Sequence, residues 1–325
     1  MKPNRIGVLT SGGDAPGMNA AIRAVVRQSL AMGVDVYGIY RGFQGLVDQD
    51  WRPLTSRNCA NILQRGGTIL NTARCQAFKV KSVRAQAARD MKAAGIDALV
   101  VIGGDGSFTG AHLLSEEHGI PCAGIPGTID NDLPGTERTL GFDTALNTAI
   151  DAIDKIRDTA SSHERLFLVE VMGRSSGMIA VHTAIACGAE AVLYPESHEV
   201  SYEALVTQLR AGWERGKRSS IVVVAEGDQL GNPYEVGERL RKDHNLDLRV
   251  VVLGHIQRGG SPTAIDRIWA SLWGSEAVKR LVAGESAFYL GAQAGELVSI
   301  PLARVNDPRP APPEALTSLV PILAL

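Results

Sequence analysis

The sequence of 325 residues has only four cysteines, and none lies in a CxxC pair or in a Cys/His spacing typical of a metal site. Its formal net charge of -2 gives no electrostatic reason to expect binding to nucleic acid or to an anionic membrane surface. No apolar run approaches the roughly 18 residues of a membrane-spanning helix, and the first residues, Met1 to Arg5, lack the apolar stretch of a signal peptide. We therefore expect reduced thiols, no membrane segment and a cytoplasmic location.

The composition and the pattern of the chain are those of a globular α/β protein. Hydrophobic residues make up 45% and charged residues 21% of a chain that is long enough for two domains. Apolar strands such as residues 97–102 alternate with helices such as the amphipathic helix over residues 144–160, without a repeat or a long linker. This alternation predicts two doubly wound α/β domains that share a cleft. A helix over residues 58–64 and a turn over residues 41–45 are also expected.

Two glycine-rich turns follow apolar strands and precede helices. Ser11-Gly-Gly-Asp-Ala-Pro-Gly17 comes after the strand 6–10, and Gly103-Gly-Asp-Gly-Ser107 comes after the strand 97–102. Such a turn points free backbone N–H groups at an anion, although many turns of this kind bind nothing. Neither is the GxxxxGK[ST] or the GxGxxG pattern. Asp105 in the second turn has the chemistry to hold Mg2+ against phosphate oxygens.

A third turn, Pro126-Gly-Thr-Ile-Asp-Asn-Asp132, follows the short apolar strand 122–125. Asp130 and Asp132 are two residues apart, so in an extended chain both carboxylates point to the same side. A polar surface turn with Asx capping is the alternative interpretation. If the three turns end strands of one sheet, they line the edge at which open α/β sheets bind ligands.

Arginine and histidine side chains follow later strands. Arg174 and the loop that contains His255 and Arg258 offer positive charge to an anionic second substrate. Phosphoryl transfer requires anion cradles, Mg2+, positive charge near the moving group and a carboxylate that accepts a hydroxyl proton. A single loop arginine such as Arg74 is more often solvated surface. Together, however, these groups favour a small-molecule kinase over a purely structural protein.

The same motifs resemble those of the bacterial ATP-dependent 6-phosphofructokinases. The matching segments occur in that family's order and spacing from residue 6 to about residue 285, and they are residues 9–20, 103–107, 126–132, 172–174 and 254–262. The resemblance implies an enzyme that transfers the γ-phosphoryl group of ATP to the 1-hydroxyl of fructose 6-phosphate, the committed step of glycolysis. It also implies Mg2+ as cofactor and a cytoplasmic homotetramer whose active sites are shared between subunits.

The resemblance assigns an ATP-binding domain to residues 1–141 and 254–304. A fructose 6-phosphate-binding domain is formed by residues 142–253 and 305–325, with the active site in the cleft between the two. The implied catalytic residues are Gly12, Thr128, Asp130, Asp132 and Arg174, with Asp130 as the general base. The implied ATP site contains Gly12, Arg74, Cys75, Gly104, Asp105, Gly106 and Ser107, with Asp105 as the Mg2+ ligand.

The implied sugar site is larger. It consists of Thr128, Ile129, Asp130, Arg165, Met172, Gly173, Arg174, Glu226, Arg249, His255, Ile256, Gln257 and Arg258. Within this set, Arg165 and Arg249 correspond to arginines that reach the sugar phosphate from a neighbouring subunit. Two borrowed arginines make affinity depend on the orientation of the subunits, which is one way to produce sigmoidal binding.

An effector site for ADP or phosphoenolpyruvate is implied as well. Its residues are Arg23, Arg27, Arg157, Glu190, Arg215, Lys217 and Arg218. The segment 55–61 departs from the family pattern, because Ser56 and Asn61 stand where an arginine and an aspartate are expected. We therefore predict a pocket that responds weakly or to an altered ligand.

Three alternative functions remain. Pyrophosphate-dependent relatives carry Asp at the position of Gly106 and Lys at that of Gly127, and glycine at both positions leaves room for the α-phosphate of ATP. Relatives often have an aromatic or polar residue at the position of Cys75. This difference affects the contact with adenine and not the choice between ATP and pyrophosphate. Another kinase with a GGDG turn, for NAD or lipid, would share only residues 103–107. A non-catalytic nucleotide sensor is expected to lack the base or the metal ligand, and both Asp130 and Asp105 are present.

Overall fold

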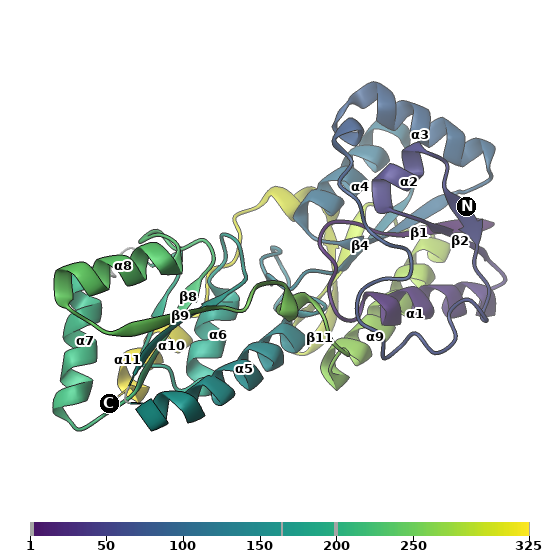
Figure 1. The fold of residues 1–325 in the computed structure, drawn as a ribbon. Helices are drawn as coiled ribbons and strands as arrows, with labels where there is room; N and C mark the ends of the chain where they lie inside the picture. Colours follow the sequence, from purple (N-terminus) through teal and green to yellow (C-terminus); the bar gives the residue numbers. More distant parts are fainter. Residues whose placement is uncertain (1–2, 164, 198–200, 325) are drawn as a thin grey trace. The chain divides into compact units, whose positions relative to one another are not determined.

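The structure is a computed structural model that describes residues 3–163, 165–197 and 201–324. The chain forms two compact units, each with its own sheet and helices (Figure 1). Unit 1 consists of residues 1–129, 133–144 and 258–309, and unit 2 of residues 130–132, 145–257 and 310–325. Two α/β units agree with the predicted fold class. Three parts of that expectation stay predictions: the ligand of each domain, the exact limits of each domain and the cleft shared by the two domains.

Unit 1 is built on a mixed sheet with the strand order β11-β10-β5-β4-β1-β2-β3 among the described residues. Its strands are β1 (Arg5–Thr10), β2 (Asp35–Ile39), β3 (Trp51–Pro53), β4 (Ala98–Gly103), β5 (Cys122–Pro126), β10 (Phe288–Gln293) and β11 (Glu296–Pro301). Its helices are α1 (Met18–Ala31), α2 (Gly42–Val47), η1 (Gln76–Lys79), α3 (Lys81–Ala93), α4 (Asp105–His118), α9 (Ala264–Ala283) and η3 (Leu302–Asn306). The central strands run parallel, whereas β3 and β11 pair antiparallel at the two edges.

Helices cover both faces of this sheet, with α2, α3 and α4 on one face and α1 and α9 on the other (Figure 1). Every residue of β4 is buried, as expected for a central strand between two helical layers. Helix α9 packs along α1. Their close approach depends on Gly274, because a Cβ there would lie 2.7 Å from the carbonyl oxygen of Ala21. The two helical layers cover the faces of the sheet, so the turns that follow its strands lie at the edge of the sheet.

Unit 2 is built on a parallel sheet with the strand order β7-β8-β6-β9 among the described residues. Its strands are β6 (Leu166–Val171), β7 (Ala191–Leu193), β8 (Ser220–Ala225) and β9 (Leu248–Val252). Its helices are α6 (Met178–Cys187), α7 (Tyr202–Glu214), α8 (Pro233–His244), α10 (Glu314–Thr317), α11 (Leu319–Leu323) and most of both α5 (Phe142–His163) and η2 (Gly254–Arg258). The C-terminal helices α10 and α11 pack against α6. None of the helices in the described ranges combines the length and the apolar composition of a membrane-spanning segment.

Local expectations were wrong at three places. Residues 58–64 form turns rather than a helix, and Asn61 there has a φ of 56°, which a right-handed helix does not accommodate. Residues 42–47 form the short helix α2 instead of a turn. Helix α4 begins at Asp105, inside the segment 103–107 that was expected to be a turn, and Gly104 in an extended conformation is its N-cap. An acidic residue in the first turn of a helix is stabilised by the helix dipole.

Candidate active site

The turns after β1, β4 and β5 lie at one edge of the unit 1 sheet. The three strands are parallel neighbours, with Thr10 paired with Ile102 and Ile102 paired with Ile125. Backbone hydrogen bonds continue beyond the strands, because the Ser11 N–H donates to the Ile102 carbonyl at 2.9 Å and the Gly127 N–H to the Gly103 carbonyl at 2.9 Å. The prediction that these turns share the carboxyl edge of one sheet is confirmed. This is the edge at which open α/β sheets bind ligands.

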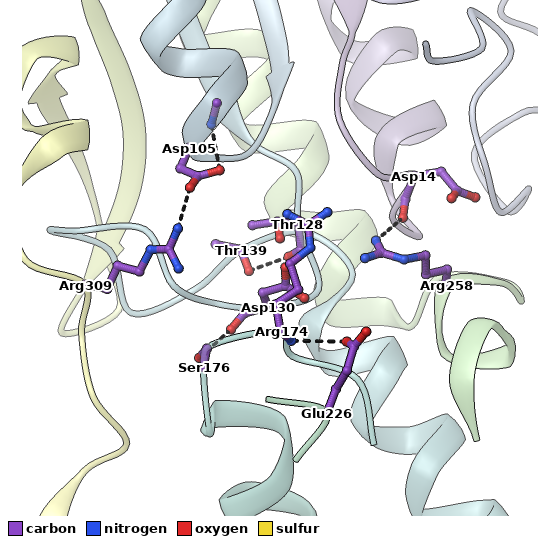
Figure 2. Close-up of polar contacts among 11 residues, drawn as sticks. Asp14, Asp105, Thr128, Asp130, Thr139, Arg174, Ser176, Glu226, Arg258 and Arg309 are labelled. Atoms are coloured by element: carbon purple, nitrogen blue, oxygen red, sulfur yellow. Dashed lines mark hydrogen bonds and ion pairs between the residues drawn. The ribbon is translucent and has the colours of Figure 1, made fainter. Parts of the chain in front are cut away.

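Three predicted ATP-site residues lie at this edge next to Thr128, which was predicted for the catalytic and sugar sites. Gly12 has a φ of 87°, which favours glycine, and a Cβ on it would lie 3.6 Å from Ser107 Oγ. A Cβ on Gly104 would lie 3.6 Å from the Cβ of Thr128. The carbonyl of Thr128 accepts a hydrogen bond from Thr139 Oγ1 at 2.6 Å (Figure 2), which anchors the third turn. Ile129, the next residue, is fully buried.

Asp105 is the first residue of α4, and both of its carboxylate oxygens have a contact within unit 1. Oδ1 accepts a hydrogen bond from the Gly106 N–H at 2.6 Å, and Oδ2 lies 2.7 Å from Arg309 Nη2 (Figure 2). The described residues include no cluster of three or more His, Cys, Asp or Glu suited to a metal. A single carboxylate fits Mg2+ that takes its other ligands from water and nucleotide phosphates.

Gly106 and Gly127, the two glycines used to infer the donor, have different surroundings. A Cβ on Gly106 would meet no atom within 4 Å, so this position is open. A Cβ on Gly127 would lie 3.0 Å from Ile102 Cγ2, 3.1 Å from Met18 Cε and 3.3 Å from the Gly103 nitrogen. Gly106 therefore fits the expectation of free space, whereas the chain's own side chains and backbone fill the space beside Gly127.

Arg74 and Cys75 precede the short helix η1. Arg74 is exposed, and Cys75 is half-buried against the core of unit 1. The segment that follows is fixed by Arg84, whose Nη1 donates to the carbonyls of Phe78 at 2.9 Å and Lys79 at 2.8 Å. The same guanidinium forms a two-pronged ion pair with Glu117 and holds the pKa of that carboxyl below its usual value.

Arg258, predicted for the sugar site, packs over the first glycine turn of unit 1. Its Nη1 donates to the carbonyl of Asp14 at 3.2 Å (Figure 2). A Cβ on Gly13 would lie only 2.5 Å from the same nitrogen. Gly13 therefore leaves space for the Arg258 guanidinium. The glycine turn has two consequences: it exposes backbone N–H groups, and it allows Arg258 to pack against it.

Asp130, Arg174 and Glu226 meet in unit 2 at the carboxyl ends of β6 and β8. Arg174 Nε lies 3.8 Å from Asp130 Oδ2, and the Arg174 N–H donates to Glu226 Oε2 at 3.3 Å. Ser176 Oγ donates to the carbonyl of Asp130 at 3.1 Å (Figure 2). A Cβ on Gly227 would lie 2.0 Å from the carbonyl oxygen of Arg174, so this loop requires glycine beside Glu226. Three residues far apart in the sequence are thus brought together.

Apart from Arg165 and Arg249, the other predicted sugar-site residues of unit 2 lie on the loop before Arg174 and on η2, and the predicted catalytic residue Asp132 lies on the piece 130–132. The Met172 N–H donates to the side chain of the fully buried Gln257 at 2.9 Å. Gly173, with a φ of 143°, makes the tight turn that leads to Arg174. His255 and Ile256 are exposed on η2. Asp132 belongs to the short piece 130–132 of unit 2, in which Asn131 has a φ of 49°.

Arg165 and Arg249 are not part of this group. Arg165 immediately precedes β6, and Arg249 is the second residue of β9, so both lie toward the amino ends of their strands. Glu226 and Met172 follow the carboxyl ends of β8 and β6. Arg249 Nη1 instead pairs with Asp247 Oδ1 at 2.8 Å. Within unit 2 these two arginines therefore lie toward the edge of the sheet opposite to Arg174.

The predicted effector residues are distributed over both units. Arg23 and Arg27 lie on α1 of unit 1, near Cys59. Burial raises the pKa of the Cys59 thiol more than the positive charge of the two arginines lowers it, so that the net pKa is about 11. In unit 2, Lys217 Nζ lies 3.5 Å from Glu190 Oε1 and donates to the Ala324 carbonyl at 2.5 Å. The other three residues of the set are Arg157, Arg215 and Arg218, of which Arg157 donates to the Cys187 carbonyl at 2.6 Å.

Sequence reasoning missed several polar residues that contact the predicted ones. Ser176 lies in the motif around Arg174, so its position gave a local signal. Thr139 and Arg309 gave none, because their partners Thr128 and Asp105 are distant in the sequence and the contacts exist only after folding.

Comparisons with known proteins converge on one family. A family model described as phosphofructokinase matches residues 5–281. The ATP-dependent 6-phosphofructokinase 1 of Thermus thermophilus is 55% identical over 321 residues, which cover 99% of each chain. The ATP-dependent 6-phosphofructokinase of Shouchella clausii is 52% identical over 303 residues, covering 93% of this chain and 94% of the relative. A solved structure of phosphofructokinase from Saccharomyces cerevisiae matches with a TM-score of 0.87 at 36% identity, covering 93% of this chain but 45% of the yeast chain.

Proposed function

The chain belongs to the phosphofructokinase family, and on this premise we propose that it is an ATP-dependent 6-phosphofructokinase. The enzyme transfers the γ-phosphoryl group of ATP to the 1-hydroxyl of fructose 6-phosphate and releases fructose 1,6-bisphosphate and ADP. The observation that carries this proposal is the identity of 55% over nearly the whole chain to a relative of that name. The three turns at one sheet edge and the cluster of Asp130, Arg174 and Glu226 support the chemistry.

The donor half of the reaction belongs to unit 1. Backbone N–H groups of the turns after β1 and β4 are suited to bind the phosphates of ATP, because glycines allow a close approach. Asp105 would hold Mg2+ together with the phosphate oxygens, and the ion would neutralise charge on the transferring group. The open position beside Gly106 leaves space for the nucleotide. Arg74 and Cys75, ahead of η1, are proposed to contact the rest of ATP.

The acceptor half of the reaction belongs to unit 2. Asp130 accepts the proton of the 1-hydroxyl as that oxygen attacks the γ-phosphorus, and this general-base step is typically worth about 10²–10⁴ in rate. Arg174 is proposed to stabilise negative charge on the transferring group, and its guanidinium already lies beside the Asp130 carboxylate. Glu226 hydrogen-bonds the backbone of Arg174 and so positions this loop for the sugar. His255 is proposed to bind the 6-phosphate; Arg258, for which the resemblance implies the same role, belongs to unit 1.

We further propose a cytoplasmic homotetramer with shared sites. The location of Arg165 and Arg249 toward the amino ends of β6 and β9 supports this proposal, since on that side they are available to a neighbouring subunit rather than to Arg174 of their own sheet. The effector pocket is proposed to respond weakly to ADP and phosphoenolpyruvate or to prefer another ligand. Initial rates at subsaturating fructose 6-phosphate test this, and strong responses to both compounds would contradict it.

The activity is tested by initial rates with fructose 6-phosphate and Mg2+, comparing ATP with pyrophosphate as the donor. Turnover with ATP alone is the expected result. Turnover with pyrophosphate would mean that Gly106 and Gly127 do not determine the donor. Absence of turnover with either donor would favour another sugar phosphate or the nucleotide sensor.

A further inference from the structure

Arg309 lies at the last position of unit 1, on a segment of residues 302–313 that we call the C-terminal strap. The strap begins with η3, which packs against α4, and then becomes rich in proline. Arg309 stands between Pro308 and Pro310. Because proline fixes its own φ and restricts the residue before it to extended conformations, the backbone presents the guanidinium from a stiff support.

The guanidinium of Arg309 is directed at the carboxylate that is proposed to bind Mg2+. Its Nη2 lies 2.7 Å from Asp105 Oδ2, and Oδ1 of the same carboxylate is hydrogen-bonded to the Gly106 N–H (Figure 2). The two side chains are 204 residues apart in the sequence, so the contact depends on the packing of the strap along α4. The positive charge of Arg309 therefore already occupies the carboxylate to which the Mg2+ ion is proposed to bind.

A divalent cation bound to Asp105 would lie about 2 Å from a carboxylate oxygen. Arg309 in its present position would then be within a few ångströms of that cation, and two positive charges at this separation repel. The cation and the guanidinium are therefore expected to weaken one another's binding to the Asp105 carboxylate.

We propose that Arg309 is an internal competitor of the metal-nucleotide complex, a tether that holds the C-terminal strap on Asp105 until the donor displaces it. This inference rests on the proposed role of Asp105 as the metal ligand. The pair is half-exposed, with 46% of the Arg309 side chain and 41% of the Asp105 side chain accessible, so solvent and salt screen it. Arg309 is therefore expected to lower the affinity for the metal-nucleotide complex moderately and not to prevent its binding.

The consequence extends beyond the donor site through the chain itself. Immediately after Arg309 the chain enters unit 2, where α10 and α11 pack against α6 and the Ala324 carbonyl accepts a hydrogen bond from Lys217. The strap, residues 302–313, continues directly into α10 and α11, and Ala324, which contacts Lys217, follows α11. Displacement of Arg309 removes one fixed end of that connection.

The test is calorimetric titration of the full chain with the non-hydrolysable analogue AMP-PNP in the presence of Mg2+. In the R309Q variant the side chain stays polar but is shorter and carries no charge. We expect R309Q to bind Mg2+·AMP-PNP about two- to fivefold more tightly than the unsubstituted protein at low ionic strength, the range that corresponds to an exposed ion pair. The gain should shrink at high salt, because only a charged competitor is screened.

R304Q is the matched control. Arg304 lies on the same strap and is similarly exposed, but its Nε pairs with Asp307 Oδ2 at 2.8 Å on the strap itself. R304Q removes the same charge from the segment and should leave the affinity unchanged. An equal gain in both variants would show that the general charge of the strap, not the contact with Asp105, sets the affinity, and would overturn the proposal.

D105N separates failure of this inference from failure of the proposed function. If D105N binds Mg2+·AMP-PNP as tightly as the unsubstituted protein, Asp105 is not the metal ligand and the inference falls with that assignment. If D105N binds more weakly, as expected, but R309Q binds equally well or more weakly than the unsubstituted protein, only the tether is overturned. A weaker R309Q would instead make Arg309 a ligand of the nucleotide.

Discussion

Arg174 Nε lies 3.8 Å from Asp130 Oδ2, and the backbone of Arg174 has a φ of 52°. A left-handed conformation is uncommon for a residue other than glycine and requires support from its surroundings. That support comes from Glu226, which accepts the Arg174 N–H, and from the close approach of Gly227. The chain therefore holds the guanidinium beside the proposed base in a conformation that a relaxed loop would rarely adopt.

Replacing Asp130 by asparagine should lower kcat by about 10²–10⁴, with a small change in KM for fructose 6-phosphate. The carboxamide keeps the shape of the side chain but cannot accept the proton of the 1-hydroxyl. Steady-state kinetics measure both constants. D151N is the control, because Asp151 is an exposed carboxylate on α5 that pairs with Lys155. A D130N enzyme with near-normal kcat would contradict the role of Asp130.

Replacing Gly106 by aspartate should raise KM for ATP by about tenfold or more while the protein stays folded. The position is open, and an acidic side chain in the first turn of α4 suits the helix dipole, so stability is not expected to fall. The new negative charge, however, would repel the phosphates. G106A, which adds volume without charge, should bind ATP nearly normally. Equal losses in G106A and G106D would point to the backbone rather than to charge.

Shared active sites can be tested by mixing two impaired proteins. R249A should bind fructose 6-phosphate poorly and D130N should turn over slowly, so each alone is weak at low substrate. If Arg249 serves a neighbouring subunit, reassembled mixtures should regain activity in about a quarter of the sites, those that combine an intact Asp130 with an intact Arg249 across the interface. Activity no higher than the average of the two parents would show that Arg249 acts within its own chain or not at all.

Asp266 should make stability depend on pH. Its carboxylate accepts hydrogen bonds from the Gly141 N–H at 2.9 Å and the Thr144 N–H at 3.0 Å, yet burial raises its pKa above the usual 3.8. The folded state therefore binds this proton more tightly than the unfolded state does. The contribution of Asp266 to stability is full below the unfolded pKa and falls as the pH rises through the folded pKa.

Urea unfolding of the unsubstituted protein and of D266N between pH 4 and pH 7 measures this effect. The difference in the free energy of unfolding should fall with rising pH by at most about 1.4 kcal/mol per pH unit and then level off. An increase of that difference with pH would mean that the hydrogen bonds from Gly141 and Thr144 outweigh burial and depress the pKa of Asp266.

Much of the fold and the donor edge could be predicted because local patterns carry them. The apolar strands ending at Gly103 and Pro126 are followed by turns, and parallel strands bring such turns to one edge. The pattern did not specify where helices begin, since Asp105 was assigned to a turn and lies in α4. Whether Gly127 leaves free space was also beyond the sequence, because the neighbouring Ile102 and Met18 come from other elements.

Contacts between distant side chains were the least predictable. Nothing near Arg309 or Thr139 in the sequence indicates Asp105 or Thr128 as a partner. Ser176 was closer to prediction, since it lies in the motif around Arg174, but its bond to the Asp130 carbonyl depends on how residues 130–132 join unit 2. Local periodicity determines elements, whereas the packing of several elements determines such pairs.

The most direct test of the proposed reaction is a phosphorus NMR spectrum of the purified protein incubated with ATP, Mg2+ and fructose 6-phosphate. We predict that one new phosphate appears on carbon 1 of the sugar in an amount equal to the ADP formed. Release of inorganic phosphate with unchanged fructose 6-phosphate, or a new phosphate on another carbon, would contradict the assignment of Asp130 as the base that activates the 1-hydroxyl.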